Sequence, residues 1–138
     1  MPAMPLPQEW DLFLSHANPA VVATIRKDGS PHSVATWYDW RDGRVMLNMD
    51  AKRIRLEHIR RDPRVALTVF DKQEWEVHLS LLGRVVEIRD DYTLEDIDRL
   101  AMRYTRLPFG RRDRARVTAF MEPERWHGWG PEGNLVPR

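Results

Sequence analysis

The chain has 138 residues, of which 42% are hydrophobic and 31% charged, and its formal net charge is +1. This length fits a single domain with its own core, and a nearly neutral charge gives no overall field that would attract nucleic acid or an anionic membrane. Without any cysteine, the chain has no disulfides, thiolate nucleophiles or Cys-ligated metals. No apolar run reaches membrane-spanning length, and the start of the chain lacks signal-peptide features. We therefore expect one cytoplasmic domain over 1–138, with an N-terminal extension over 1–7.

The first part of the chain predicts a short helix followed by an antiparallel meander. Trp10, Phe13 and Leu14 recur at helical spacing. The β-branched run that follows ends in Lys27-Asp28-Gly29-Ser30, which has the composition of a hairpin turn. The predicted elements are a helix over 8–16 and strands over 20–26, 32–40 and 45–49.

The second part predicts two helices, three strands and a tail. Pro63 closes a helix that follows the third strand, and Gly83 is a place where a long strand bends. Thr93 is a plausible N-cap for a later amphipathic helix. The predicted elements are helices over 52–62 and 92–107, strands over 64–70, 75–89 and 116–121, and a Pro- and Gly-rich tail over 122–138.

These elements predict a mainly β fold with flanking helices. About six strands joined by hairpins indicate an antiparallel barrel with helices at its edge. A dinucleotide-binding fold of alternating strands and helices is disfavoured, because the chain has no Gly-x-Gly-x-x-Gly motif and its helices do not alternate with its strands.

Basic residues are dense between Lys52 and Arg64 and again between Arg111 and Arg116. Such local density suits an anionic small molecule better than a polymer. Arg53 and Arg55 would diverge by about 200° on an ideal helix, which favours a solvated face. At a strand-to-helix junction, however, both guanidiniums and the first helical amides can converge on one phosphate.

The sequence offers no catalytic constellation and no metal site. Its five histidines show no paired metal-ligand spacing, and no Ser-His-Asp arrangement is recognisable. His32 and His78 lie on predicted strands, where they are either partly buried structural residues or contacts to a ligand. We therefore predict no catalytic side chain, as in an enzyme whose cofactor supplies the chemistry.

Several short motifs carry a family resemblance. They are Ala23-Thr24-Ile25, Asp28-Gly29-x-Pro31, Arg53-x-Arg55 and Arg60-Arg61-Asp62-Pro63-Arg64-Val65. In this order and spacing the chain resembles the pyridoxamine 5'-phosphate oxidase-like split β-barrels, and most of all their actinobacterial branch that uses the deazaflavin coenzyme F420. The resemblance extends from Trp10 to Trp129. It implies a six-stranded antiparallel split barrel of the FMN-binding type, and a homodimer whose cofactor sites lie at the subunit interface.

The resemblance also implies which residues contact the cofactor. Two arginines and a lysine correspond to the grip on its phosphate, with an asparagine at the end of the third strand beside them. Residues of the second strand run along the ring and its ribityl chain, and a tryptophan reaches over from the partner subunit. The implied residues are His32, Ala35, Thr36, Asn48, Lys52, Arg53, Arg55 and Trp75.

Some positions depart from the family pattern or are left open by it. Asp50 puts a carboxylate near the expected anion, and His58 stands where the family more often has Asn; either change weakens or alters cofactor binding. A further arginine set, Arg60, Arg61 and Arg64, is either solvated or meets a polyglutamate tail. In the predicted tail, Trp126 and Trp129 either close over the pocket or dock on the partner.

The leading functional hypothesis is an oxidoreductase that transfers hydride between reduced F420 and a small conjugated organic acceptor. FMN is the alternative cofactor, because a phosphate grip alone does not separate the two. A non-catalytic flavin or haem carrier shares the barrel and the dimer. Pyridoxamine phosphate oxidation is disfavoured, since the C-terminal segment lacks the basic substrate-binding residues that it needs. A nucleic-acid-binding barrel is disfavoured by the low net charge.

Overall fold

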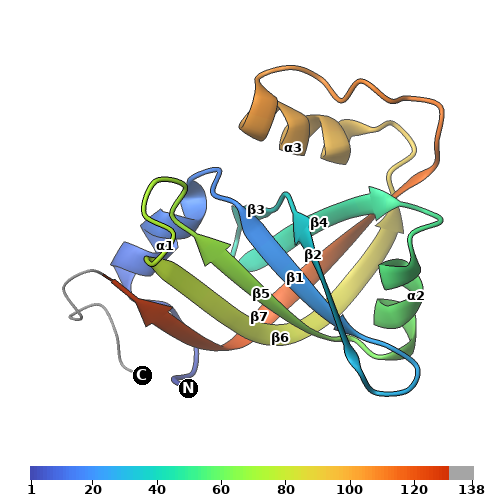
Figure 1. Cartoon of the computed structure of the whole chain (residues 1–138). Coiled ribbons are helices and arrows are strands. Elements are labelled where there is room, and N and C mark those ends of the chain that lie inside the picture. Colours follow the sequence, from blue (N-terminus) through green and yellow to red (C-terminus); the bar gives the residue numbers. More distant parts are fainter. Residues whose placement is uncertain (131–138) are drawn as a thin grey trace.

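The computed structural model describes residues 1–130, and its strands form one antiparallel sheet of seven strands in the order β2-β1-β5-β6-β7-β4-β3. The sheet curls into a barrel with β1, β2 and β5 on one side and β4, β6 and β7 on the other (Figure 1). The strands are β1 (Ala20–Ile25), β2 (Pro31–Thr36), β3 (Asp39–Arg41), β4 (Arg44–Asp50), β5 (Arg64–Phe70), β6 (His78–Asp90) and β7 (Arg116–Trp129). The helices are α1 (Gln8–Ser15), α2 (Ile54–Arg61) and α3 (Glu95–Thr105).

The predicted fold class is confirmed, with one strand more than expected. The single strand predicted over 32–40 is two strands, β2 and β3, because the chain leaves the sheet at Trp37 and Tyr38. Tyr38 turns into the core, where its hydroxyl donates to the carbonyls of Leu14 (2.9 Å) and His16 (2.8 Å). The helix predicted over 52–62 begins only at Ile54, and the helix over 92–107 is shorter at both ends.

The predicted tail was wrong for its first part. β7 continues to Trp129 and pairs with β6 along its whole length, so 122–129 is strand. Trp126 faces inward on this strand and is 2% exposed, which places it in the core and not over a pocket. Strand alternation explains the difference, since Met121, Pro123 and Trp126 are buried while Glu122 and Glu124 are exposed. The rest of the predicted tail, 131–138, lies outside the described residues.

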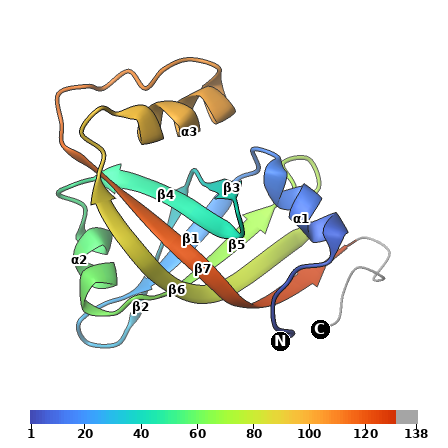
Figure 2. The ribbon, with the colours of Figure 1, turned by 180° about the vertical axis from the view of Figure 1, so that it is seen from behind.

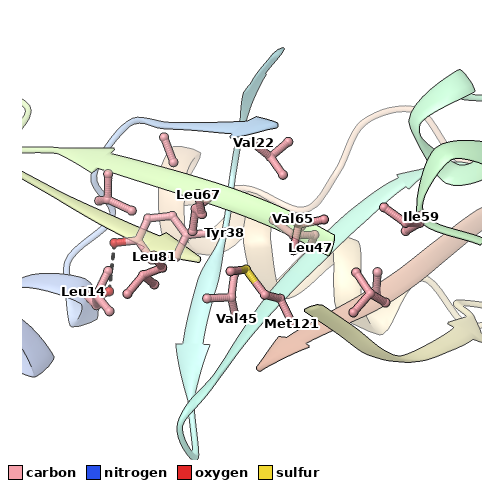
Figure 3. Packing of buried hydrophobic residues seen from close by; sticks show 14 of the residues in the cluster. Leu14, Val22, Tyr38, Val45, Leu47, Ile59, Val65, Leu67, Leu81 and Met121 are labelled. Carbon is pink, nitrogen blue, oxygen red and sulfur yellow. Dashed lines mark hydrogen bonds between the residues drawn. The ribbon is translucent and has the colours of Figure 1, made fainter. Parts of the chain in front are cut away.

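The core fills the barrel interior between its two sides. Inward residues alternate along β1 and β5, and aliphatic side chains from every long strand meet there, as Figure 3 shows for Val22, Val65 and Leu67. α1 and α2 lie at opposite ends of the barrel in both views (Figures 1 and 2). Within the described residues, no helix is long and apolar enough to cross a membrane.

Gly83 marks the bend that was predicted in β6. The register between β6 and β7 shifts at Leu82/Gly83, and a Cβ at Gly83 would overlap the carbonyl oxygen of Glu122. The absent side chain therefore lets β7 approach closely where the barrel turns a corner.

α3 lies outside the barrel, above β4 in both views (Figures 1 and 2). Ile97 and Leu100 pack on Met46 and Phe120, which form a small second core. The predicted N-cap, Thr93, was wrong. Leu94 holds that position with φ of 64° and no side-chain cap, and the carboxylate of Asp91 accepts the hydrogen bonds of the first helical amides instead.

At its other end α3 is tied to α1. The guanidinium of Arg103 donates to the carbonyl oxygens of Leu14 (3.0 Å), Ser15 (2.8 Å) and His16 (2.7 Å), where α1 ends. These carbonyls have no partner inside their own helix, so a cation there satisfies them and complements the helix dipole. α3 is thus fixed over the barrel from both of its ends.

Candidate functional site

A cavity of about 750 Å³ lies between α3 and the barrel. Its volume is within the range of sites that hold small organic ligands. It takes residues from the start of β1, the end of β2, the end of β4, the start of α2, α3, the loop after α3 and the start of β7. The lining residues are Ala17, Pro19, Ala20, Ala35, Thr36, Trp37, Asn48, Asp50, Arg53, Arg55, Ile97, Leu100, Tyr104, Phe109, Arg111, Arg114 and Arg116.

The lining is strongly cationic on the side where β4 ends and α2 begins. Arg53 is the N-cap of α2 with extended backbone (φ −68°, ψ 136°), so Arg53 and Arg55 both line the cavity and do not diverge as they would on one continuous helix. Burial lowers the pKa of the Arg55 guanidinium, and the charges of Arg53 and Arg116 lower it further. Neither Arg53 nor Arg55 forms an ion pair with any carboxylate of residues 1–130.

Arg116 comes from the start of β7 and completes this cationic side. β4 and β7 pair so that Asp50 lies opposite Arg116 and Asn48 opposite Thr118. The Arg116 guanidinium lies over the Phe109 ring, 4.7 Å from its centroid, and its Nε donates to Asn48 Oδ1 (2.8 Å). Burial lowers its pKa, partly opposed by Asp50 and Asp91. The contacts leave the guanidinium without a carboxylate in direct contact among the described residues.

Asp50 does not present an unpaired carboxylate to the cavity. Its Oδ1 accepts from the backbone N–H of Lys52 (2.9 Å), which forms the turn between β4 and α2. Its Oδ2 accepts from Arg114 (3.1 Å). The Lys52 amide is the main reason that the pKa of Asp50 lies below its usual value. The carboxylate is thus neutralised by Arg114, and the other lining arginines keep their positive charge.

The opposite side of the cavity is apolar and aromatic. Trp37, just after β2, stacks on Tyr104 of α3 with ring centroids 5.4 Å apart and planes 9° apart. Phe109 meets the Trp37 ring edge-on at 6.4 Å. Tyr104 Oη donates to the carbonyl of Asn18 (2.7 Å), which holds the ring in place. A ligand that fits this cavity therefore combines a planar or apolar part with an anionic end.

The structure brings together five of the eight predicted contact residues: Ala35, Thr36, Asn48, Arg53 and Arg55. Lys52 lines a neighbouring cavity of about 550 Å³ with Asp50 and Arg114. Trp75 is 72% exposed and does not line the main cavity within its own chain. That Trp75 reaches into the site of a partner subunit stays a prediction.

His32 lies away from the cavity. It points to the inner side of β2, where its ring meets that of His58 edge-on at 5.2 Å. His58, from α2, is 4% exposed, and its Nδ1 is hydrogen-bonded to Thr24 Oγ1 (2.8 Å). Burial lowers the pKa of His58, and His32 lowers it further. Both histidines thus join α2 to the barrel, and neither lines the cavity.

The predicted contact residues include two of the five arginines that line the cavity and miss Arg111, Arg114 and Arg116. The density of arginines between Arg111 and Arg116 was a signal for an anion, but nothing in the sequence shows that the start of β7 pairs with the end of β4. Conversely, Arg60, Arg61 and Arg64 do not line the cavity. Arg64 instead pairs with Asp62 (2.7 Å). The described residues contain no group of three or more side chains suited to a metal ion.

Comparison with known proteins identifies relatives of this architecture. A protein described as an F420 reductase shares 26% identity with a TM-score of 0.81, over 88% of this chain and 98% of its own. A conserved hypothetical protein from Mycobacterium tuberculosis shares 26% identity with a TM-score of 0.75, over 99% and 91% of the two chains. General Stress Protein 26 from Bacillus anthracis, at 19% identity and a TM-score of 0.66 over 88% and 92%, shares the fold.

None of the functionally curated proteins compared with this chain matches it. The sequence model of a protein family does match, over residues 6–130, which is nearly the whole of the barrel and its helices. The matched span includes the sheet, the cavity and all of the lining arginines. The chain belongs to the pyridoxamine 5'-phosphate oxidase family.

Proposed function

We propose that the protein is an oxidoreductase that binds coenzyme F420 and transfers hydride between the reduced coenzyme and a small conjugated acceptor. The observation that carries the proposal is a cavity with five arginines and a single carboxylate on one side and stacked aromatic rings on the other. The similarity to an F420 reductase supports it. Three of the guanidiniums, Arg53, Arg55 and Arg116, have no carboxylate contact among residues 1–130, so the residues present fit a phosphate-bearing cofactor.

Each part of the cavity has a task in this proposal. Arg53 and Arg55 bind the phosphate with charge-assisted hydrogen bonds, and the start of α2 adds its dipole. Trp37 and Tyr104 shield one side of the cavity from water. When bound, the deazaflavin supplies the hydride chemistry. The chain itself orients the cofactor and leaves space for an acceptor.

F420 carries glutamate carboxylates beyond its phosphate, whereas FMN carries a phosphate alone. Arg111 and Arg114 add cationic groups beside the phosphate grip, and the Arg111 side chain is exposed and pairs with Asp113 (3.6 Å). A ligand with several negative charges satisfies this excess better than one with a single phosphate. This charge balance is the reason for preferring F420 over FMN.

The proposal includes a homodimer that completes the site. Apart from Arg64 at the start of β5, the outward residues of β1 and β5 are uncharged, with Val21 opposite Thr68 and Ala23 opposite Ala66. An antiparallel sheet that faces water normally carries charged or polar side chains there. Ala35 lies on this same outer face of β2 and also lines the cavity. A second copy packed on this face therefore lies next to the cavity and closes it.

Titration of the purified protein with F420 and, separately, with FMN tests the cofactor. Absorbance and fluorescence report binding, and we expect tighter binding of F420, with a preference that shrinks as salt rises because exposed arginines are screened over about 8–10 Å. Equal or tighter binding of FMN at low salt contradicts the F420 proposal. Failure of both cofactors to bind contradicts the proposal of a flavin-type site altogether.

A further inference from the structure

A chain of buried hydrogen bonds connects the start of α3 to the cationic side of the cavity. Asp91, Asn48 and Thr118 are 5%, 5% and 0% exposed. Asn48 Nδ2 donates to Asp91 Oδ2 (3.1 Å) and to Thr118 Oγ1 (3.0 Å). On its other side, Asn48 Oδ1 accepts from Arg116 Nε (2.8 Å). Asp91 directly follows β6, Asn48 is on β4 and Thr118 is on β7. Their last partner, Arg116, is the cation of this chain of hydrogen bonds, and it lines the cavity.

These bonds determine which way the Asn48 amide points. A carboxylate accepts hydrogen bonds and donates none, so Asp91 requires the NH₂ group of Asn48. Thr118 also requires the NH₂ group of Asn48, because the only hydroxyl proton of Thr118 is donated to Asp96 Oδ2 (2.6 Å). A flipped amide would place an oxygen against both acceptors, at a cost that is high in a buried site. The amide oxygen therefore faces Arg116.

Asp91 also fixes the start of α3. Its carboxylate accepts from the backbone N–H groups of Asp96 (3.2 Å) and Ile97 (3.0 Å), and its carbonyl accepts from Leu94 (3.2 Å). Leu94 offers no capping side chain and has a left-handed backbone, so Asp91 replaces the usual N-cap. One carboxylate therefore holds both α3, which covers the cavity, and the amide that holds Arg116.

We propose that Asn48 and Asp91 are positioning residues that act through Arg116. Asp91 sets the orientation of the Asn48 amide, and the amide oxygen holds the Arg116 guanidinium at the cavity. Both amide hydrogens of Asn48 already have partners, so Asn48 has no N–H left to donate to a phosphate. In this proposal Asn48 lies at the cavity because it aligns Arg116, and not because it contacts the ligand.

The first experiment needs no cofactor. In protein labelled with ¹⁵N, the exchange of the Arg116 Nε–H with solvent is followed by NMR. We expect exchange to become at least about tenfold faster in Asn48→Leu and in Asp91→Asn, as loss of one hydrogen bond to a charged group implies. Asp90→Asn makes the same chemical change at the neighbouring exposed position and should leave the exchange as it is. Unchanged exchange in folded Asn48→Leu overturns the proposal.

Thermal melts establish that each variant is folded. Asp91→Asn also removes the cap of α3, so a loss of folding in this variant leaves Asn48→Leu to decide the result. Asn48→Leu keeps the carboxylate of Asp91 on the helix amides, and leucine has the same branching at Cγ as asparagine.

The second experiment rests on the proposed function and uses F420 as the probe. A double-mutant cycle combines Asn48→Leu with Arg116→Met. We expect Asn48→Leu to weaken binding at least about fivefold alone and to have no further effect when Arg116 is already replaced. Independent, multiplicative effects overturn the proposal, because they show that Asn48 contacts the ligand itself. If F420 does not bind the wild-type protein, the proposed function fails, and the exchange measurement alone decides this inference.

Discussion

Arg55 is the side chain with the strongest physical argument for binding an anion. It is half-buried, its pKa is lowered by burial and by Arg53, and it has no carboxylate partner among residues 1–130. A buried cation without a counter-ion is unfavourable, and a bound phosphate removes this penalty. Relief of this penalty when an anion binds thus adds to the affinity for the ligand.

We expect Arg55→Met to weaken F420 binding by about ten- to a hundredfold, the value of a charge-assisted hydrogen bond. Isothermal titration calorimetry measures the change. Arg60→Met is the matched control, since Arg60 is exposed on the same helix and does not line the cavity. Equal losses in the two variants would indicate a general effect of positive charge and contradict a specific phosphate contact.

His58 makes the stability of the protein depend on pH. Because burial lowers its pKa in the folded state, the unfolded chain takes up a proton first as the pH falls through about 6.5. Stability is therefore fully present above that pH and is lost below it, by about 1.4 kcal/mol for each unit of pKa displacement. The groups around the ring are His32, Arg61, Arg26 and Glu57, and all but Glu57 oppose protonation.

Replacing His58 by Asn tests this link. We expect the free energy of unfolding of the wild-type protein to fall between pH 7 and pH 5, and to fall less in His58→Asn. Urea unfolding at several pH values provides the measurement, with His16→Gln as an exposed control. Parallel pH profiles in the wild type and in His58→Asn would show that another group titrates.

Elements whose limits depend on local chemistry could be predicted from the sequence. The hairpin turn before Ser30, the end of α2 at Pro63 and the bend at Gly83 follow from backbone preferences, and the structure has all three. The break between β2 and β3 and the length of β7 could not be predicted. Both depend on which long-range partner a segment meets: Tyr38 meets the end of α1, and 122–129 meets β6.

The same contrast between local chemistry and long-range pairing explains how much of the candidate site could be predicted. Arg53 and Arg55 stand in a local motif at a strand-to-helix junction, so the sequence locates them. Arg116 and Asp91 join the site only through pairing of β4 with β7 and through packing of α3. No local pattern encodes a contact between positions 48 and 118, and short-range reasoning therefore missed it.

The bend in β6 gives a direct test at the level of the sheet. Gly83→Ala places a methyl group against the Glu122 carbonyl and 2.8 Å from Pro123 Cα. We expect a loss of at least about 2 kcal/mol in the free energy of unfolding, because backbone on both strands must move. Gly110→Ala, where a Cβ meets nothing within 4 Å, should change it by less than about 0.5 kcal/mol. A small loss in the free energy of unfolding of Gly83→Ala would mean that β6 and β7 can move apart at this bend at little cost.

For the molecule as a whole, the outer face of β1 and β5, which is uncharged apart from Arg64 at the start of β5, predicts a homodimer. Ala66 lies near the middle of this face, half-buried and opposite Ala23. Ala66→Arg would bury a charge in the interface, so we expect a monomer at micromolar concentration and weaker cofactor binding, because the partner no longer closes the site. Sedimentation equilibrium distinguishes the two states. The control variant Leu12→Arg changes a side chain that is exposed on α1, and it should stay dimeric. A monomeric wild-type protein would contradict the proposed assembly.

The place of β7 in the sheet has a consequence for how the protein is made. β7 is the last strand within residues 1–130, yet it lies between β6 and β4. During translation, a nascent chain that lacks β7 leaves β4 and β6 with unpaired edges and leaves the core open on one side. The barrel therefore closes only once β7 has left the ribosome. Pairing across such long sequence separations is slow, and the exposed edges make early release or truncation of the chain a route to aggregation.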